Sequence, residues 1–325
     1  MAWQDFRQEA RLMSKVEQDA RLNRRLTHDR PGRRFLANDD ARWGELILPA
    51  PDENPAKTTR GLRVLLIAST ALSCRAVKTV VAYEHRHPER VNLVGLVTDD
   101  PIDADARIGI KKRVWKFLDD RQRLEVETAI VEVALSAGAP VYTGEIKVEW
   151  FSRQATHWHP DVILVCGFGQ VIDQKIIGLP LGGIYNFHPS DLAHHHGAGP
   201  APYDDYQTCD LATTVWTVHQ MVEAVDAGPI LGQSPPINIR DQAGSLPEEP
   251  MLVYNKLIDP LAYMVYFLLD ALAQRYHRGE MRPLEQLDFE RRFPASVKAQ
   301  IMAPIVSQEI VPLLTGPDSI LFDLE

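Results

Sequence analysis

An asparagine, a histidine and an aspartate occur in this chain at spacings that suit chemistry on a carbonyl group. The stretch YNFHPS places Asn186 and His188 two residues apart. Because side chains alternate faces along a strand, both point the same way at the end of an extended segment. An amide donor beside an imidazole can hold and protonate an oxyanion that develops on a carbonyl carbon. A carboxylate is then needed to orient the imidazole, and the sharp turn VDAGP supplies Asp226. These three residues predict acyl transfer.

The histidines that follow suggest a second interpretation, a metal site. His194, His195 and His196 are consecutive, and His188 or His219 would have to complete the ligand set. A zinc site needs three or four convergent ligands with supporting partners, and adjacent histidines in a loop do not project easily to one point. We therefore expect no metal. For His219, which lies in the segment TVH, a structural role and direct chemistry both stay open.

The elements that must position these residues are apolar segments of strand length. LRVLLIA, VNLVGLVT, APVYTG, DVILVCGFG and GGIYNFH alternate with helix-length segments from residue 62 onward. Unbroken apolar strands of this kind suit a parallel sheet covered on both faces. We predict an α/β fold with a doubly wound, mostly parallel sheet. Ligands of such sheets lie outside the carboxyl ends of the strands, so the loops after VLLIA, VILVC and IYNF are expected to line the site.

The rest of the pattern divides the chain into three parts. Residues 1–60 are expected to form a helical N-terminal extension, with an arginine-rich amphipathic arm over 5–30, and a proline-rich linker. Residues 61–280 form the predicted catalytic domain, which ends in a long helix from about Leu252 to His277. Residues 281–325 form a small C-terminal extension. We expect the arm to serve packing or homodimerisation, and both extensions to wrap the catalytic domain.

Composition limits the class of protein. The chain has 325 residues, 45% of them hydrophobic, and a formal net charge of -9, which argues against a protein that neutralises nucleic-acid phosphates. Cys74, Cys166 and Cys209 are far apart and predict reduced, buried thiols in a cytosolic protein. The N-terminus lacks the apolar stretch of a signal peptide, and the most apolar helical segment contains acidic residues and a proline. We therefore expect a cytoplasmic enzyme that contacts neither a membrane nor nucleic acid.

The order of the segments resembles a known family. PDVILVCGFGQVIDQKIIGLPLGGIYNFHPS, followed by TTVWTVHQMVEAVDAGPILGQSPPI, is similar to the catalytic domain of formyltetrahydrofolate-dependent formyltransferases. This family includes glycinamide ribonucleotide transformylase and methionyl-tRNA formyltransferase. Its Asn-x-His-Pro-Ser motif matches Asn186, His188, Pro189 and Ser190, and its Asp-x-Gly-Pro turn begins at Asp226. The similarity covers roughly residues 62–280 and implies a Rossmann-like formyltransferase fold.

The resemblance implies that a formyl group passes from 10-formyltetrahydrofolate to a primary amine through a tetrahedral intermediate. Asn186 would hold the formyl oxygen, and His188 would donate to the same oxygen while paired with Asp226. Asp226 would also order the water that relays the proton of the amine. The pterin would lie in an apolar slot, bonded to main-chain groups of two loops. The expected cofactor-binding residues are Val165, Phe168, Gly169, Gln170, Val171, Ile172, Ile177, Val222, Glu223, Ala224 and Val225.

The acceptor side is where this chain departs from the family. A Leu-Leu-Pro-x-x-Arg-Gly loop borders the acceptor in the family, whereas this chain has DLAHHHG, which predicts acceptor contacts from Ser190, His194, His195, His196 and Gly197. The stretch IASTALSCRAV lacks the glycines that cradle a ribonucleotide phosphate, and the acidic charge and short C-terminal extension disfavour tRNA.

We therefore expect a small-molecule amine as the acceptor, such as an amino sugar nucleotide or an amino-acid-like amine. Two alternatives stay open. One is a formyltetrahydrofolate deformylase, in which water replaces the amine. The other is a non-catalytic folate-binding module, which intact Asn186, His188 and Asp226 disfavour.

Overall fold

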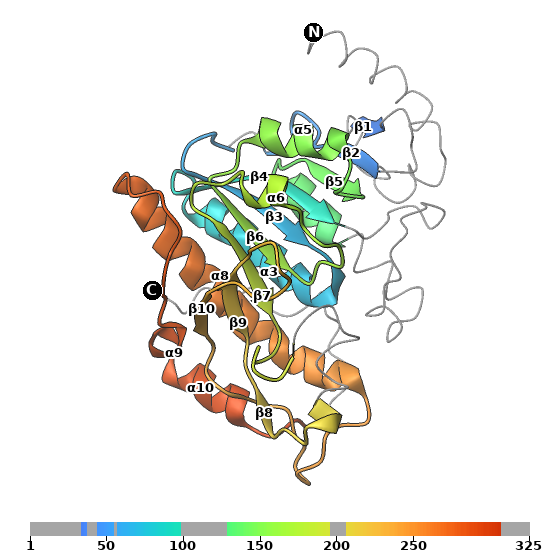
Figure 1. Cartoon of the computed structure of the whole chain (residues 1–325), viewed down its shortest axis with the longest axis vertical. Helices are drawn as coiled ribbons and strands as arrows, with labels where there is room; N and C mark the ends of the chain where they lie inside the picture. Colours follow the sequence, from blue (N-terminus) through green and yellow to red (C-terminus); the bar gives the residue numbers. More distant parts are fainter. Residues whose placement is uncertain (1–33, 38–43, 55–56, 99–128, 196–205, 307–325) are drawn as a thin grey trace.

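A nine-stranded sheet with the order β1-β2-β5-β4-β3-β6-β7-β9-β10 forms the centre of the molecule in the computed structural model (Figure 1). A second sheet pairs β11 with β8. The structure describes residues 34–37, 44–54, 57–98, 129–195 and 206–306. The strands are β1 (Arg34–Ala37), β2 (Gly44–Leu48), β3 (Leu62–Ala68), β4 (Val91–Thr98), β5 (Val141–Gly144), β6 (Val162–Cys166), β7 (Ile184–His188), β8 (Thr213–Thr214), β9 (Thr217–Gln220), β10 (Ile230–Gln233) and β11 (Ile237–Asn238). The helices are α3 (Thr70–Arg86), α5 (Glu149–Trp158), α6 (Gln174–Ile177), α8 (Pro250–His277), α9 (Phe289–Arg292) and α10 (Ala295–Met302).

The five central strands, β5, β4, β3, β6 and β7, run parallel. From β3 the chain builds outward to β4 and β5 on one side, and then to β6 and β7 on the other. Right-handed crossovers in these opposite directions place α3 and α5 on opposite faces of the sheet. The predicted α/β, doubly wound fold with a mostly parallel core is confirmed.

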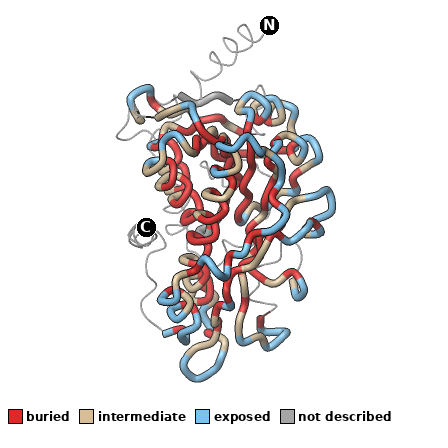
Figure 2. The backbone as a smooth tube through the Cα atoms, turned by 90° about the vertical axis from the view of Figure 1, so that its left-hand side faces the viewer, coloured by how far each residue is buried: buried red, intermediate tan, exposed pale blue. Residues whose placement is uncertain are grey.

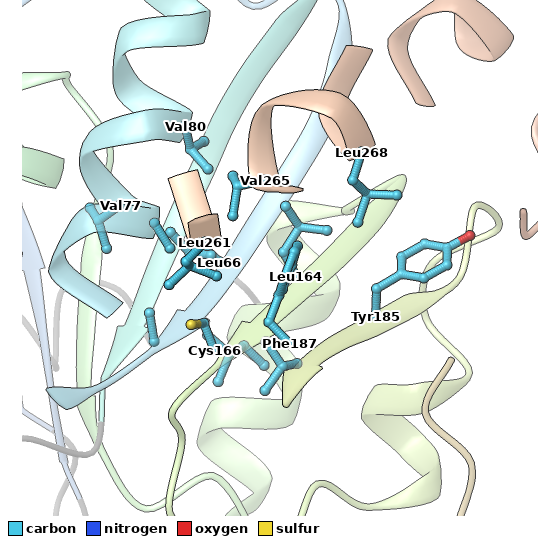
Figure 3. Close-up of a cluster of buried hydrophobic side chains, with 14 of the residues drawn as sticks. Leu66, Val77, Val80, Leu164, Cys166, Tyr185, Phe187, Leu261, Val265 and Leu268 are labelled. Atoms are coloured by element: carbon cyan, nitrogen blue, oxygen red, sulfur yellow. The ribbon is translucent and has the colours of Figure 1, made fainter. Parts of the chain in front are cut away.

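Helices α3 and α8 cover one face of the sheet, and the polar residues of β7 therefore point to the other face. Figure 3 shows Phe187 on β7 in one cluster with Val77 of α3 and Leu261 of α8, and all three are buried. Because successive side chains of a strand point to opposite faces, Asn186 and His188 lie on the face away from these helices. The core therefore fixes the direction of the candidate catalytic pair.

The long helix α8 begins at Pro250, where a missing backbone N–H costs nothing, and is followed by Gly279 at φ 70°. It agrees with the predicted helix from about Leu252 to His277. Among the described residues, α8 is the one helix long and apolar enough to cross a membrane by those two criteria, but 67% of its most apolar window is buried inside the protein. Figure 2 shows buried residues gathered along the central strands and the helices beside them, so α8 is a core helix.

Two strands lie where the sequence predicted an extension and a linker. Residues 34–37 and 44–48 form β1 and β2, and β2 pairs antiparallel with β5, with Gly44 opposite Gly144 and Ile47 opposite Val141. The partner strand lies nearly 100 residues further along the chain, so no local pattern could show the pairing. The predicted helical arm over residues 5–30 lies outside the described residues.

The segment after α8 packs along the last strands of the sheet. Leu284 N–H donates to the Tyr185 hydroxyl of β7 at 2.7 Å, and its carbonyl accepts from Gln220 Nε2 of β9 at 2.6 Å. Leu287 N–H donates to the Leu231 carbonyl of β10 at 2.9 Å. This part of the C-terminal extension therefore packs against β7, β9 and β10.

The cysteines differ in part from the prediction. Cys74 and Cys166 are buried, but Cys209 is exposed, since it follows a short helical turn at residues 206–208 outside the sheet. The prediction of a buried thiol was therefore wrong for Cys209. Burial raises the pKa of Cys74 to about 11 and that of Cys166 to about 12, which makes both thiols inert at neutral pH.

Candidate active site

The two central residues of the site come from β7, and a third lies directly opposite. Asn186 and His188 follow one another on the free face of β7, and the register of β7 with β9 places His219 across from Asn186. Residues directly opposite in an antiparallel pair share a face of the sheet. An imidazole, an amide and a second imidazole therefore project together beside the loop that connects β9 with β10.

Asp226, from that loop, brings its carboxylate between these side chains. Its Oδ1 lies 3.4 Å from Asn186 Nδ2 and 3.4 Å from His219 Nε2, and its Oδ2 lies 3.9 Å from His188 Nδ1. The side chains of His188 and Asp226 are each 7% exposed, and that of His219 is 1% exposed. Little water reaches the group, so its charges are weakly screened. The structure thus brings together the three residues that the sequence selected for acyl transfer.

His219 orients its neighbours. Its Nδ1 lies 3.0 Å from the Gln220 carbonyl, which can only accept, so Nδ1 carries a proton. In the neutral ring, Nε2 is then an acceptor, and it lies 3.1 Å from Asn186 Nδ2. In the charged ring, Nε2 would donate to Asp226 instead. Of the two roles left open for His219, the contacts favour a structural one that holds the amide and the carboxylate in place.

The turn around Asp226 depends on an unusual backbone. Asp226 has φ 52°, in the left-handed region that residues other than Gly, Asn and Asp rarely adopt. A Cβ on Gly228 would lie 1.8 Å from the Gln220 carbonyl oxygen, so this position accepts only glycine without movement of the backbone. Gln220 N–H donates to the Pro229 carbonyl at 2.9 Å and holds the loop against β9. The loop therefore turns back toward the sheet and places the Asp226 carboxylate beside His188.

The two loops expected to hold a pterin lie side by side and carry exposed apolar side chains. Gln174 Nε2 lies 3.4 Å from Glu223 Oε2 and links the segment after β6 with the loop after β9. Val171 is 51% exposed, Val222 39% and Val225 56%. Three exposed valines beside a buried polar site are what an apolar ring system could cover. These residues could therefore hold the flat end of a folate.

Gln170 has a role that the sequence did not suggest. Its Oε1 accepts from Ile146 N–H at 3.0 Å, and its Nε2 donates to the Gly144 carbonyl at 2.8 Å, which ties the loop after β6 to the end of β5. No spacing signal marks such a side-chain link between loops. Val165 and Ile172 are each 3% exposed and belong to the core beneath the loops. The other expected cofactor residues divide between partly buried side chains, Phe168 and Ile177, and exposed positions, Gly169 and Ala224.

The predicted acceptor residues fall into different environments. Ser190 is 2% exposed and its carbonyl accepts from Thr217 Oγ1 at 2.8 Å, so it lies inside the protein rather than at a surface. His194 is exposed, whereas His195 stacks on His188 with ring centroids 5.3 Å apart. His196 and Gly197 lie outside the described residues. No group of three potential metal ligands occurs in the part of the chain that the structure describes.

Comparison with known proteins finds one family that matches part of the chain. Residues 117–249 match the model of the family described as formyl transferase. The matched segment, less than half of the chain, is similar to a formyl transferase domain. This segment contains the site residues of β7, β9 and the Asp226 loop. The formyl transferase resemblance inferred from the motifs is therefore confirmed.

Proteins similar to this chain include the methionyl-tRNA formyltransferase of Thermotoga neapolitana, 25% identical over 69% of this chain and 62% of that protein. That of Marinobacter nauticus is 32% identical over 39% of this chain and 40% of its own length. The chain thus matches less than two thirds of these relatives. Among solved structures, phosphoribosylglycinamide formyltransferase from Anaplasma phagocytophilum aligns with a TM-score of 0.47 and 18% identity, over 66% of this chain and 88% of that one.

Proposed function

We propose that this protein transfers the formyl group of 10-formyltetrahydrofolate to a primary amine of a small molecule. The observation that carries the proposal is the convergence of Asn186, His188 and Asp226 in a segment that is similar to a formyl transferase domain. A partly buried amide beside a buried imidazole and a buried carboxylate, at these distances, matches the needs of attack on a formyl carbon, where negative charge develops on oxygen.

In the proposed reaction, the amine nitrogen forms a bond to the formyl carbon, and the bond from that carbon to N10 of the folate breaks. Asn186 donates from Nδ2 to the formyl oxygen. Its 3.4 Å contact with Asp226 is long for a hydrogen bond, so that hydrogen can be given to the substrate. His188 donates to the same oxygen from Nε2, and Asp226 stabilises the charged ring. The proton lost by the amine passes to N10.

The exposed valines support the proposed cofactor. A pterin placed between the loop at Val171 and the loop at Val222 and Val225 would cover apolar surface that water now contacts. Main-chain groups of both loops can bond the polar edge of the ring. No metal enters the proposed reaction.

The proposed acceptor is a small molecule. The net charge of -9 supports it, since an acidic protein is poorly suited to gather a polyanion. The similarity to methionyl-tRNA formyltransferases favours a second candidate, the amino group of methionyl-tRNA. The two acceptors differ by charge and size, so one experiment separates them.

The decisive experiment is incubation of the protein with 10-formyltetrahydrofolate alone, with a pool of small amines from a cell extract, and with methionyl-tRNA. Release of tetrahydrofolate is followed in each, and the formylated product is identified by mass. Release that requires small amines supports the proposal. Release with methionyl-tRNA only would replace the acceptor, and release without any amine indicates a hydrolase. Binding of the cofactor without release in any mixture would leave a binding module and reject transfer.

A further inference from the structure

A histidine of the DLAHH segment lies flat against the candidate catalytic imidazole. The rings of His188 and His195 have centroids 5.3 Å apart and planes inclined by 16°. The ring of His188 is thus packed on one face by a residue from the segment in which this chain departs from the family motif. His195 is half-buried, so this packing is an interior contact rather than a chance surface encounter.

The turn that carries His195 is held by four contacts to Asp191. The Asp191 carbonyl accepts from the N–H groups of His194 and His195 at 2.9 and 3.0 Å, and its carboxylate accepts from Ala193 N–H at 3.0 Å. Gln233 Nε2 of β10 lies 3.3 Å from the same carboxylate. These bonds form one helical turn anchored to the sheet.

Gln233 also reaches the neighbouring strand. Its Nε2 lies 3.1 Å from Thr217 Oγ1 of β9, and that hydroxyl donates to the Ser190 carbonyl, just before the turn. The turn and the strand that bears His188 are therefore fixed to a common frame. These hydrogen bonds fix the backbone of His195 relative to the sheet, so the position of its ring does not depend on the side-chain torsions alone.

The reaction needs the plane of the His188 ring to be fixed. Nδ1 lies 3.9 Å from Asp226 Oδ2, which is beyond hydrogen-bond distance, so this pair alone does not set the ring torsion. A terminal torsion of this type has a broad energy minimum, and the nearly parallel ring of His195, with its centroid 5.3 Å away, narrows the range of torsion angles open to His188.

We propose that His195 is a positioning residue, which by stacking on His188 holds Nδ1 toward Asp226 and leaves Nε2 for the formyl oxygen. This inference rests on the proposed function. It assigns His195 to His188 rather than to the acceptor, and it needs no charge on His195. Among the residues that the structure describes, Asp226, His219 and Asp191 are ionisable groups near the pair, and the proposal requires none of them to titrate.

Three variants test the role in turnover of 10-formyltetrahydrofolate with the acceptor that gives the highest rate. We expect His195→Ala to lower kcat about 10-fold with the KM for the folate unchanged, as expected for loss of one aromatic contact. His195→Phe keeps a flat ring and should restore kcat to within about 3-fold of the parent. His157→Ala, an exposed histidine of α5, is the matched control and should leave kcat unchanged. Full activity of His195→Ala, or equal losses in both His195 variants, would overturn the proposal.

A second measurement does not depend on activity. The Hε1 signal of His188 in a histidine-labelled sample is assigned by its loss in His188→Gln. The ring current of the stacked partner should shift this signal in His195→Ala, and His195→Phe should keep a ring-current shift. An unchanged signal in His195→Ala refutes the stack. If the shift is present but the parent protein does not turn over any acceptor, the proposed function fails, and the catalytic consequence fails with it.

Discussion

At the scale of single residues, Asp226 combines demands that few side chains meet. It lies at positive φ, contacts two histidines and an amide, and has a side chain that is 7% exposed. An asparagine tolerates the same backbone and nearly the same shape, so replacing Asp226 with Asn removes the charge without adding strain. The charge and the conformation of this position can therefore be separated by experiment.

We expect Asp226→Asn to lower kcat for formyl transfer by roughly 100- to 1000-fold, because the charged form of His188 loses its partner. Steady-state kinetics measure this. The thermal midpoint and the affinity for the folate should stay close to those of the parent protein. Turnover near the parent value with intact folate binding would remove Asp226 from the mechanism. His188→Ala should have a similar effect on kcat.

The addition of one methyl group at Gly228 should destabilise the protein. The added Cβ would lie 1.8 Å from the Gln220 carbonyl oxygen, a backbone atom that cannot rotate away. We expect Gly228→Ala to reduce the free energy of unfolding by about 1 to 3 kcal/mol and to reduce activity as well. Urea denaturation measures the first effect. Gly178→Ala is the control, because the nearest atom to its Cβ is 3.3 Å away and its backbone is helical.

At the scale of elements, the segment after α8 is hydrogen-bonded to the strands that carry the site. The hydroxyl of Tyr185 joins two parts of the chain, since it donates to the Gly182 carbonyl at 2.9 Å and accepts from Leu284 N–H at 2.7 Å. Tyr185 lies on β7, on the face that packs against the core helices, opposite the candidate site. The C-terminal segment thus contributes to the position of β7 without reaching the site.

We expect Tyr185→Phe to lower the free energy of unfolding by about 1 to 3 kcal/mol, because it leaves a buried N–H and a buried carbonyl without their partner. Denaturation in urea with an unchanged slope would show that stability alone is altered. No change in the midpoint would mean that Leu284 and Gly182 find other partners in the variant.

Sequence reasoning succeeded where local patterns decide the structure. The five parallel strands are unbroken apolar segments, and the alternation of β7 places Asn186 and His188 on one face. It failed where partners are distant or where a side chain joins loops. β2 pairs with β5, nearly 100 residues further along the chain, and the link from Gln170 to Gly144 has no sequence signature. The stacking of His195 on His188 depends on a turn whose anchor, Gln233, lies about 40 residues further on.

At the scale of the whole molecule, burial divides the thiols into two classes. Burial raises the pKa of Cys74 to about 11 and that of Cys166 to about 12. At a pH below its pKa, a thiol is mostly uncharged and therefore unreactive. We expect a disulfide reagent at pH 8 to label one thiol of the native protein, Cys209, and all three after denaturation. Cys209→Ser should abolish native labelling. Fast labelling of more than one native thiol would contradict the burial of the other two.

The segments that flank the parallel strands also determine which edges of the sheet are covered. β2 pairs with β5 on one side of the parallel core, and Leu287 bonds to β10 at the other side. An uncovered strand offers a row of free N–H and carbonyl groups to any other chain with a matching edge. A protein shortened to begin at residue 56 would lose β1 and β2 and open the edge of β5. Such a protein should self-associate and precipitate during expression even though it keeps Asn186, His188 and Asp226.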